Sequence, residues 1–287
     1  MRLIRRMKAE ANRIVIQKLP IPPVNLEKGE VAIKMERVLL TPLDFLLLQG
    51  YLDRKFLGTL GYGRVLEKTS SDIPEKASLY PDKCSNFPPI GREGVGSEIY
   101  PYHPRLLKNP PVNLKFPEMI FIYDLVVTEA ELAEGQTLVI GGEGLQTLLL
   151  SVLLKDATLF GPEKRFKGLG NVPIISAENL AGSEWETIVV NTLNLSSTYY
   201  ALKKTRWKNL IVNPFFACIN EKVPISVNSF KATIAFPTEK LRNIRISYED
   251  LDKLTAESPF IQEISLGELG ELELRGYISV SFRDDGD

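Results

Sequence analysis

Residues 136–160 constrain the fold more than any other part of the chain. They predict, in order, a strand at 137–140, a glycine turn at 141–144, an apolar helix at 145–155 and a strand at 158–160. A strand that enters a helix through glycines is typical of the corner that holds the pyrophosphate of a dinucleotide. Glycines let the backbone approach the phosphates, and the helix N-terminus offers free N–H groups and the positive end of its dipole.

The glycine motif departs from the usual pattern. It reads Gly142-x-Gly144-x-x-Thr147, with threonine where a third Gly or Ala is expected. Glu143 also brings a carboxylate that repels a pyrophosphate unless it points away. Two interpretations stay open. Either Gly142, Gly144, Leu145 and Thr147 still contact a pyrophosphate, or the turn is inherited and no longer binds.

Composition narrows the classes of partner. The 35 Lys and Arg residues against 36 Asp and Glu give a net charge of −1, so no basic field attracts nucleic acid or an anionic membrane. We find no run of about 18 apolar residues and no signal-peptide pattern at the start, so we expect a cytoplasmic protein without a membrane span. Two cysteines and one histidine are too few for a zinc site of four Cys or His ligands.

The sequence changes character near residue 121. Residues 1–120 are rich in proline and short β-runs and predict an irregular, barrel-like β domain, completed by residues 245–287. Residues 121–244 alternate strands with helices and predict a doubly wound parallel sheet, so the fold class is α/β. In the first domain we predict strands at 31–37, 38–41, 64–68, 271–274 and 277–282, a helix at 248–256 and a loop at 72–92. In the second we predict helices at 121–132, 163–168 and 197–204, and strands at 173–175, 187–190, 209–212, 225–228 and 232–236.

In order and spacing, several segments resemble the medium-chain dehydrogenase/reductases, which include zinc alcohol dehydrogenases and quinone oxidoreductases. The matching segments are 38–44, 49–50, 56–67, 95–100, 134–141 and 169–171. The resemblance implies a GroES-like β-rich domain and a Rossmann dinucleotide-binding domain.

The same resemblance implies that zinc is absent. Thr41 stands where zinc members place a cysteine ligand, and Thr59 and Leu60 stand where they have His-Glu. The several cysteines of the family's zinc lobe reduce to Cys84. Threonine and leucine do not replace thiolate or imidazole as zinc ligands, so we expect no metal site.

Glu163 and Lys164 follow the second strand of the predicted sheet, slightly later than the acid that binds ribose hydroxyls in NAD-binding units. Lys164 suits the 2′-phosphate of NADP, and zinc-free quinone reductases are similar in using a lysine there. The alternative is a helix N-terminus with exposed charges. If a cofactor binds, we favour NADP over NAD.

Polar residues also follow the later strands. Asn191 and Thr192 come after the fourth strand, where they either bond a ribose or carboxamide or cap the next helix. Pro214 is similarly placed after the fifth strand, and the aromatic pair at 215–216 either stacks on a ring or closes the pocket.

Without zinc, hydride transfer needs a proton donor near the substrate oxygen. We name Thr41 and Tyr62 as candidate donors, with Tyr51 as a further hydroxyl. Asp44 is a candidate catalytic acid, and the alternative is a structural acid that pairs with an arginine or caps a turn.

The resemblance therefore implies a zinc-independent, NAD(P)-dependent oxidoreductase that acts on a small molecule in the cleft between its two domains. It also implies a homodimer formed along the sheet edge, for which 225–228 is the candidate strand. The alternative is a non-catalytic binding or scaffold protein that kept the fold and lost its sites.

Overall fold

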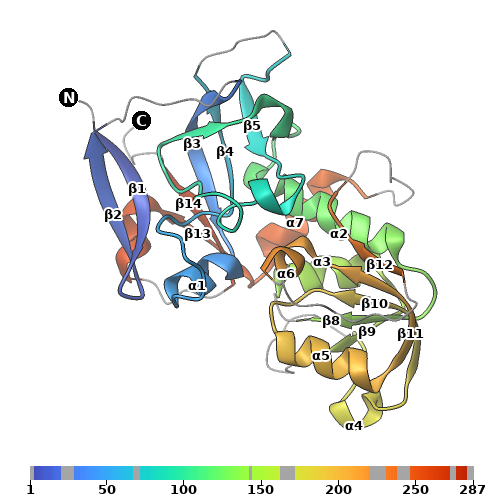
Figure 1. Cartoon of the computed structure of the whole chain (residues 1–287). Coiled ribbons are helices and arrows are strands. Elements are labelled where there is room, and N and C mark those ends of the chain that lie inside the picture. The colour runs from blue at the N-terminus through green and yellow to red at the C-terminus, as the bar shows by residue number, and fades with distance from the viewer. Residues whose placement is uncertain are drawn as a thin grey trace. The chain divides into compact units, whose positions relative to one another are not determined.

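The computed structural model describes residues 3–20, 29–66, 72–141, 144–161, 172–219, 231–237, 246–271 and 276–282. The chain divides into two compact units (Figure 1). The first unit comprises Met1–Phe121 and Phe260–Asp287, and the second comprises Ile122–Pro259.

The first unit begins with an antiparallel hairpin of β1 (Leu3–Glu10) and β2 (Arg13–Pro20). Its turn consists of Ala11 and Asn12, with φ angles of 48° and 64°. Two positive φ angles match the twist of a two-residue hairpin turn. The sequence conceals this turn because neither residue is glycine.

A seven-stranded sheet forms the body of the first unit, in the order β13-β14-β3-β4-β5-β7. The long β3 pairs through its first half with β6 and through its second half with β14. The strands are β3 (Val31–Leu40), β4 (Leu60–Val65), β5 (Lys76–Leu79), β6 (Ile99–Tyr102), β7 (Leu107–Lys108), β13 (Ile261–Ser265) and β14 (Tyr277–Ser281). The helical segments are α1 (Pro42–Leu48), η1 (Cys84–Asn86), η2 (Pro104–Leu106), η3 (Pro117–Met119) and η5 (Leu266–Glu271).

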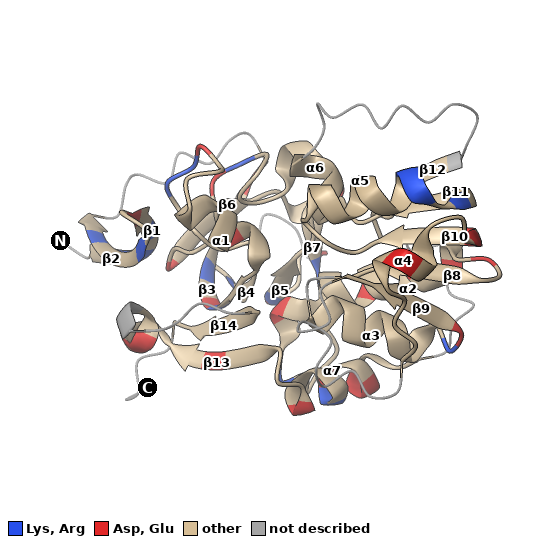
Figure 2. Cartoon of the chain, turned by 90° about the horizontal axis from the view of Figure 1, so that it is seen from below, with Lys and Arg blue, Asp and Glu red and all other residues tan. Residues whose placement is uncertain are grey.

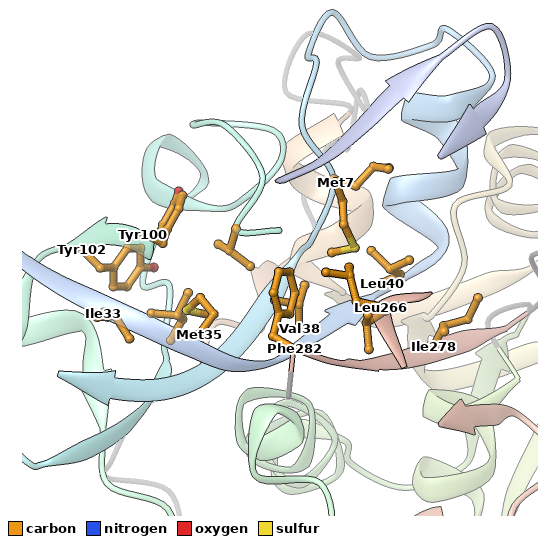
Figure 3. Close-up of a cluster of buried hydrophobic side chains, with 14 of the residues drawn as sticks. Met7, Ile33, Met35, Val38, Leu40, Tyr100, Tyr102, Leu266, Ile278 and Phe282 are labelled. Carbon is orange, nitrogen blue, oxygen red and sulfur yellow. The ribbon is translucent and has the colours of Figure 1, made fainter. Parts of the chain in front are cut away.

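Apolar side chains from β1, β3, β6 and β14 meet in the main core of the first unit (Figure 3). Met7, Val38 and Ile278 are fully shielded from solvent, and each such side chain contributes roughly 1.5–3 kcal/mol. Gly61 on β4 lets this core close, because a Cβ there would lie 2.0 Å from Cε of Met35.

Some predictions for the first unit were wrong. The predicted strands at 31–37 and 38–41 form one strand, β3, with a bulge between Met35 and Arg37. Helix α1 was not predicted, and β5 lies inside the predicted loop of 72–92. The predicted strand at 64–68 begins at Leu60, because glycines in β4 hide its strand pattern.

The second unit contains five parallel strands in the order β12-β11-β10-β8-β9. They are β8 (Thr137–Ile140), β9 (Ala157–Phe160), β10 (Glu184–Val190), β11 (Arg206–Val212) and β12 (Lys231–Ile234). Ile174 adds a parallel bridge to Leu159, on β9. With this bridge counted as the third strand in chain order, the sheet reads 3-2-1-4-5-6, the order of a Rossmann fold.

Helices cover both faces of this sheet, with α5 on one side and α3 and α7 on the other (Figures 1 and 2). Ile140, Val190 and Val212 pack on the α5 side, while their strand neighbours Val139 and Val189 are equally buried. The helices are α2 (Ile120–Leu132), α3 (Leu145–Leu153), α4 (Ala177–Leu180), α5 (Leu195–Lys204), α6 (Pro214–Ile219) and α7 (Tyr248–Glu257). None of the helices in the described ranges is both long and apolar enough to cross a membrane.

The helices and strands that were predicted for the second unit on described residues are observed within three residues at each end, with one exception. The strand predicted at 173–175 reduces to the single bridge of Ile174. The helix predicted at 163–168 and the strand predicted at 225–228 lie outside the described residues. The strand predicted at 271–274 is wrong at Glu271, which ends η5, and 272–275 are outside the described residues.

Helix α7 belongs to the second unit, whereas the predicted boundary placed residues 245–287 with the first. The physical reason is a pair of hydrogen bonds to α2. The hydroxyl of Tyr123 donates to Asp252 Oδ1 at 3.0 Å, and the hydroxyl of Tyr248 donates to Asp124 Oδ1 at 2.6 Å.

Removing the Tyr123 hydroxyl should test this attachment. Tyr123→Phe leaves the buried Asp252 without that donor, so we expect the free energy of unfolding to fall by about 1–2 kcal/mol. Tyr200→Phe is the control, because that exposed hydroxyl bonds Ala177 O at 3.2 Å, and it should change stability by less than about 0.5 kcal/mol. Urea denaturation measures both, and equal effects would contradict the assignment.

Candidate functional site

The strand order of the second unit reverses between β8 and β10. From β8 the chain continues outward to β9 on one side, and from β10 it continues to β11 and β12 on the other. In open α/β sheets, ligands bind outside the carboxyl ends of the strands at such a reversal. The residues that follow β8 and β10 are therefore the first place to search for a site.

The turn after β8 leads into an uncapped helix. Gly144 is the N-cap of α3, with φ 45° and ψ −81°, and this positive φ favours glycine. No side chain of Gly144 can cap α3, and the first turn of α3 has no acidic residue. This arrangement suits an anion. The predicted contacts of Gly142 fall outside the described residues, as do those of Glu143.

Leu145 and Thr147 lie in the first turn of α3 and are both fully buried. The Thr147 hydroxyl has no hydrogen-bond partner among the described residues. The helix therefore accommodates threonine at the third motif position, at the cost of an unsatisfied polar group, about 1–3 kcal/mol.

Asn191 directly follows β10 and is fully buried. Its backbone N–H donates to Ile140 O at 2.9 Å, yet neither polar atom of its side chain has a partner within the described ranges. The alternative of a helix cap falls to another residue, because Asn194 Oδ1 accepts from Ser197 N and caps α5. Thr192 Oγ1 accepts from Asn194 N at 3.1 Å. Asn191 therefore has an amide that is available to a ligand.

The residues after β11 form a polar network that was not predicted. Asn213 Nδ2 donates to Glu129 Oε1 at 2.9 Å and to Gln146 Oε1 at 2.8 Å. All three side chains are buried. Burial raises the pKa of Glu129 to about 8, and the hydrogen bond from Asn213 opposes that rise. An asparagine directly after a strand is the sequence signal that points to this network.

Pro214 begins α6 and is buried, as are both aromatic residues behind it. Phe216 packs in the core with Leu138 and Val190, so it closes the interior on the α5 side of the sheet. At the end of the second strand, the ring of Phe160 stacks on that of Tyr200 with the ring centres 6.0 Å apart. Phe160 ends β9, and both Glu163 and Lys164 lie outside the described residues.

In the first unit, Asp44 ties the start of α1 to residues 58–59. Its Oδ1 accepts from Gly58 N at 2.6 Å, and its Oδ2 accepts from the Thr59 hydroxyl at 2.7 Å and from Thr41 N at 2.9 Å. Thr41 Oγ1 accepts in turn from Leu43 N at 3.2 Å, which completes a capping box at the start of α1. Asp44 thus occupies the capping role that was its alternative interpretation.

Thr41 and Thr59, the two positions matched to metal ligands, lie side by side. Their hydroxyl oxygens are 2.7 Å apart, and both residues are fully buried. Because Thr59 donates its only hydroxyl proton to Asp44, Thr41 must be the donor to Thr59. Burial raises the pKa of Asp44 to about 6, and hydrogen bonds from Thr41, Thr59 and Gly58 oppose that rise.

The remaining candidates are Tyr62 and Leu60 on β4 and Tyr51 shortly after α1. Tyr62 is half-buried on β4 between Arg37 and Ser78, with the Lys76 ammonium 5.8 Å from its ring centre. Tyr51 is 75% exposed. Leu60 is fully buried at the start of β4. Among the described residues we find no cluster of three or more His, Cys, Asp or Glu side chains placed to hold a metal ion.

No protein-family model matches the sequence, and no curated protein matches it. Solved structures do match, over nearly the whole chain. A zinc-binding dehydrogenase from Sinorhizobium meliloti 1021, bound to NADP, has a TM-score of 0.63 and 15% identity over 98% of this chain and 100% of its own. The short chain alcohol dehydrogenase RspB from E. coli CFT073, complexed with NADH, has a TM-score of 0.64 and 14% identity over 98% of this chain and 99% of its own. The quinone oxidoreductase of Coxiella burnetii has a TM-score of 0.63 and 14% identity over 98% and 100%.

These matches confirm the predicted fold. The chain has the two-domain α/β fold of the medium-chain dehydrogenase/reductases, a GroES-like β-rich domain with a Rossmann domain. Identities of 14–15% establish the fold, and the activity must be argued from the site itself.

Asp44→Asn tests the capping network. An amide NH2 in place of Oδ2 would face the donors of Thr41 and Thr59, so we expect the free energy of unfolding to fall by about 2–4 kcal/mol. Asp250→Asn is the matched control, since Asp250 accepts from the Ser247 hydroxyl at an exposed helix start, and it should cost less than about 1 kcal/mol. Chemical denaturation compares the two, and a tolerated Asp44→Asn would contradict the network.

Proposed function

We propose that the protein is a zinc-independent, NAD(P)-dependent oxidoreductase of the medium-chain alcohol dehydrogenase type. The observation that carries the proposal is the strand reversal between β8 and β10. The glycine corner lies on one side of it, and on the other lies the side-chain amide of Asn191, which has no partner among the described residues. The NADP and NADH bound in two structures of the same fold support it.

The residues present fit a dinucleotide. Backbone N–H groups of Gly142, Gly144, Leu145 and Thr147 are proposed to hold the pyrophosphate at the start of α3, where the dipole favours an anion. Asn191 would bond a ribose or carboxamide, because its buried donor and acceptor otherwise lack partners among the described residues. When bound, the nicotinamide supplies or accepts a hydride.

The other predicted cofactor contacts are proposed as well. Thr192 is still proposed as a cofactor contact beside Asn191, although its hydroxyl already accepts a hydrogen bond from Asn194 N. Pro214, at the start of α6, is proposed to contact the cofactor. Glu163 and Lys164 carry the preference for NADP over NAD, and that preference stays a prediction.

For proton transfer we propose the chain of hydroxyls in the first unit. In the direction of alcohol oxidation, the substrate hydroxyl would give its proton to Thr41 as Thr41 passes its own proton to Thr59 and Thr59 passes its own to the Asp44 carboxylate. In the direction of reduction, the same relay would run in reverse and deliver the proton of a protonated Asp44 to the substrate oxygen. Tyr62 is the second candidate donor. We propose that the substrate is a small molecule. That it binds next to the cofactor in a cleft between the two domains stays a prediction.

Zinc independence rests on side-chain chemistry. Thr41 and Thr59 engage each other and Asp44, and Leu60 offers no ligand atom. We also propose a homodimer, for which the candidate edge at 225–228 lies beyond the described residues.

A non-catalytic binding or scaffold protein is the second candidate function. Thr147 favours it, since its buried side chain adds bulk at the third motif position, where helix and strand pack closely. Cofactor binding distinguishes the two functions.

Fluorescence and thermal-shift titrations with NADH and NADPH should show binding. Gly144→Glu should abolish it, because a carboxylate at the start of α3 repels the pyrophosphate. Gly182→Glu is the matched control. Gly182 also has a positive φ, of 81°, but it precedes β10 and so lies at the amino ends of the strands, whereas Gly144 follows the carboxyl end of β8. Absence of binding at millimolar NADH and NADPH would eliminate the oxidoreductase and leave the scaffold function.

Metal analysis of the purified protein tests the proposed zinc independence. We expect no stoichiometric zinc by atomic emission spectroscopy, and we expect chelator treatment to leave the melting temperature unchanged. One zinc per chain would show that the positions of Thr41 and Thr59 have been matched wrongly.

A further inference from the structure

Glu129 is an acid on α2 that the proposed function leaves unused. Its side chain is fully buried, and its Oε1 accepts one hydrogen bond, from Asn213 Nδ2 at 2.9 Å. The second oxygen, Oε2, has no partner in the described part of the chain. A carboxylate in such surroundings is costly, whereas a neutral carboxylic acid is tolerated.

Asn213 connects this acid to the first turn of α3. The backbone N–H of Phe215 donates to Asn213 Oδ1 at 2.9 Å, which fixes the orientation of the Asn213 amide. Its Nδ2 must then face Glu129 and Gln146, and Gln146 must present Oε1 to it at 2.8 Å. The orientation of every amide in this network therefore follows from one backbone donor.

The same orientation leaves a set of unsatisfied polar atoms near the start of α3. Gln146 Nε2, the Thr147 hydroxyl and both side-chain atoms of Asn191 have no partner among the residues described. Asn213 N donates to Val190 O, and Asn191 N donates to Ile140 O, so these residues follow adjacent strands. Buried atoms of this kind are normally satisfied, and a ligand at the strand reversal would satisfy them.

Within the described residues, no charged group stabilises Glu129 as an anion. Burial is the main cause of its raised pKa, and the opposing contribution among those residues comes from the uncharged Asn213. On α7, which packs against α2, Asp252 and Tyr248 bond Tyr123 and Asp124 instead. The first turn of α3 carries no acidic residue.

We propose that Glu129 in its neutral form is a positioning residue for the anion site at the start of α3, acting through Asn213 and Gln146. The inference rests on the proposed function, because the anion is the pyrophosphate of a nicotinamide dinucleotide. Ionised Glu129 would add a negative charge behind that site and pull on the Asn213 amide that orients Gln146.

The sign of the resulting pH dependence follows from linkage. A bound pyrophosphate disfavours ionised Glu129, so its pKa is higher in the complex than in the free protein. Between those two pKa values, the complex holds a proton that the free protein has lost. Dinucleotide affinity therefore falls as the pH rises above about 8, the pKa of Glu129 in the free protein.

The first measurement uses the unmodified protein. Isothermal titration calorimetry with NADH at pH 8, in two buffers of different ionisation enthalpy, should show net proton uptake on binding. NADH is the suitable probe because its pyrophosphate does not titrate here, whereas the 2′-phosphate of NADPH has a pKa near 6. Binding without proton uptake would overturn the inference and leave the proposed function intact.

The second measurement uses variants. Wild-type affinity for NADH should fall about tenfold between pH 7 and pH 9.5, which corresponds to a pKa raised by about one unit in the complex. Glu129→Gln keeps an acceptor for Asn213 and cannot ionise, so it should bind as the wild type does at pH 7 and keep that affinity at pH 9.5.

Glu118→Gln is the matched control. Glu118 is also fully buried, burial raises its pKa to about 7, and it lies on η3 of the first unit. Its variant should keep the wild-type fall in affinity. A fall that persists in Glu129→Gln, or that disappears equally in Glu118→Gln, would overturn the inference. Absence of binding of both NADH and NADPH at every pH would overturn the proposed function and this inference with it.

Discussion

The pairing of β8 with β10 is the constraint on which the second unit depends. Its register sets Ile140 opposite Val190, so the residues that follow both strands emerge side by side. Asn191 N then bonds Ile140 O, and Asn213 N bonds Val190 O one strand further along. Because side chains alternate between the faces of a strand, a slip of one residue would turn each of these polar groups toward the opposite face. The polar edge of the sheet is thus a consequence of backbone pairing.

The parallel sheet could be predicted because its central strands contain short apolar runs buried on both faces, as in Thr187–Val190. Local runs of this kind carry their own signal. No local pattern in the sequence indicates the unit to which α7 belongs, because that depends on the contact between Tyr123 and Asp252, which are 129 residues apart. The hairpin turn of Ala11 and Asn12 was missed for a different reason, because residues other than glycine seldom adopt its backbone angles.

The candidate site shows the same division. The spacing from Thr41 to Asp44 is that of a capping box and can be read locally. The partnership of Thr59 with Asp44 spans 15 residues and emerges only when β4 pairs with β3. No pattern in the sequence indicated Glu129 as a residue of the candidate site. It sits on α2 among apolar neighbours, and only its contact with Asn213, 84 residues away, distinguishes it from any other helical glutamate.

The two threonines at the positions matched to zinc ligands have a consequence for how this chain can evolve. Thr41 also caps α1, and Thr59 also holds Asp44, so each hydroxyl serves the stability of the first unit. A cysteine at 41 would forfeit the cap before any ligand partner existed, and a histidine at 59 would displace a buried hydroxyl beside a buried acid. Neither step is favourable alone. The hydroxyl network therefore opposes single substitutions toward metal-ligand side chains at Thr41 and Thr59, and such substitutions would have to occur together.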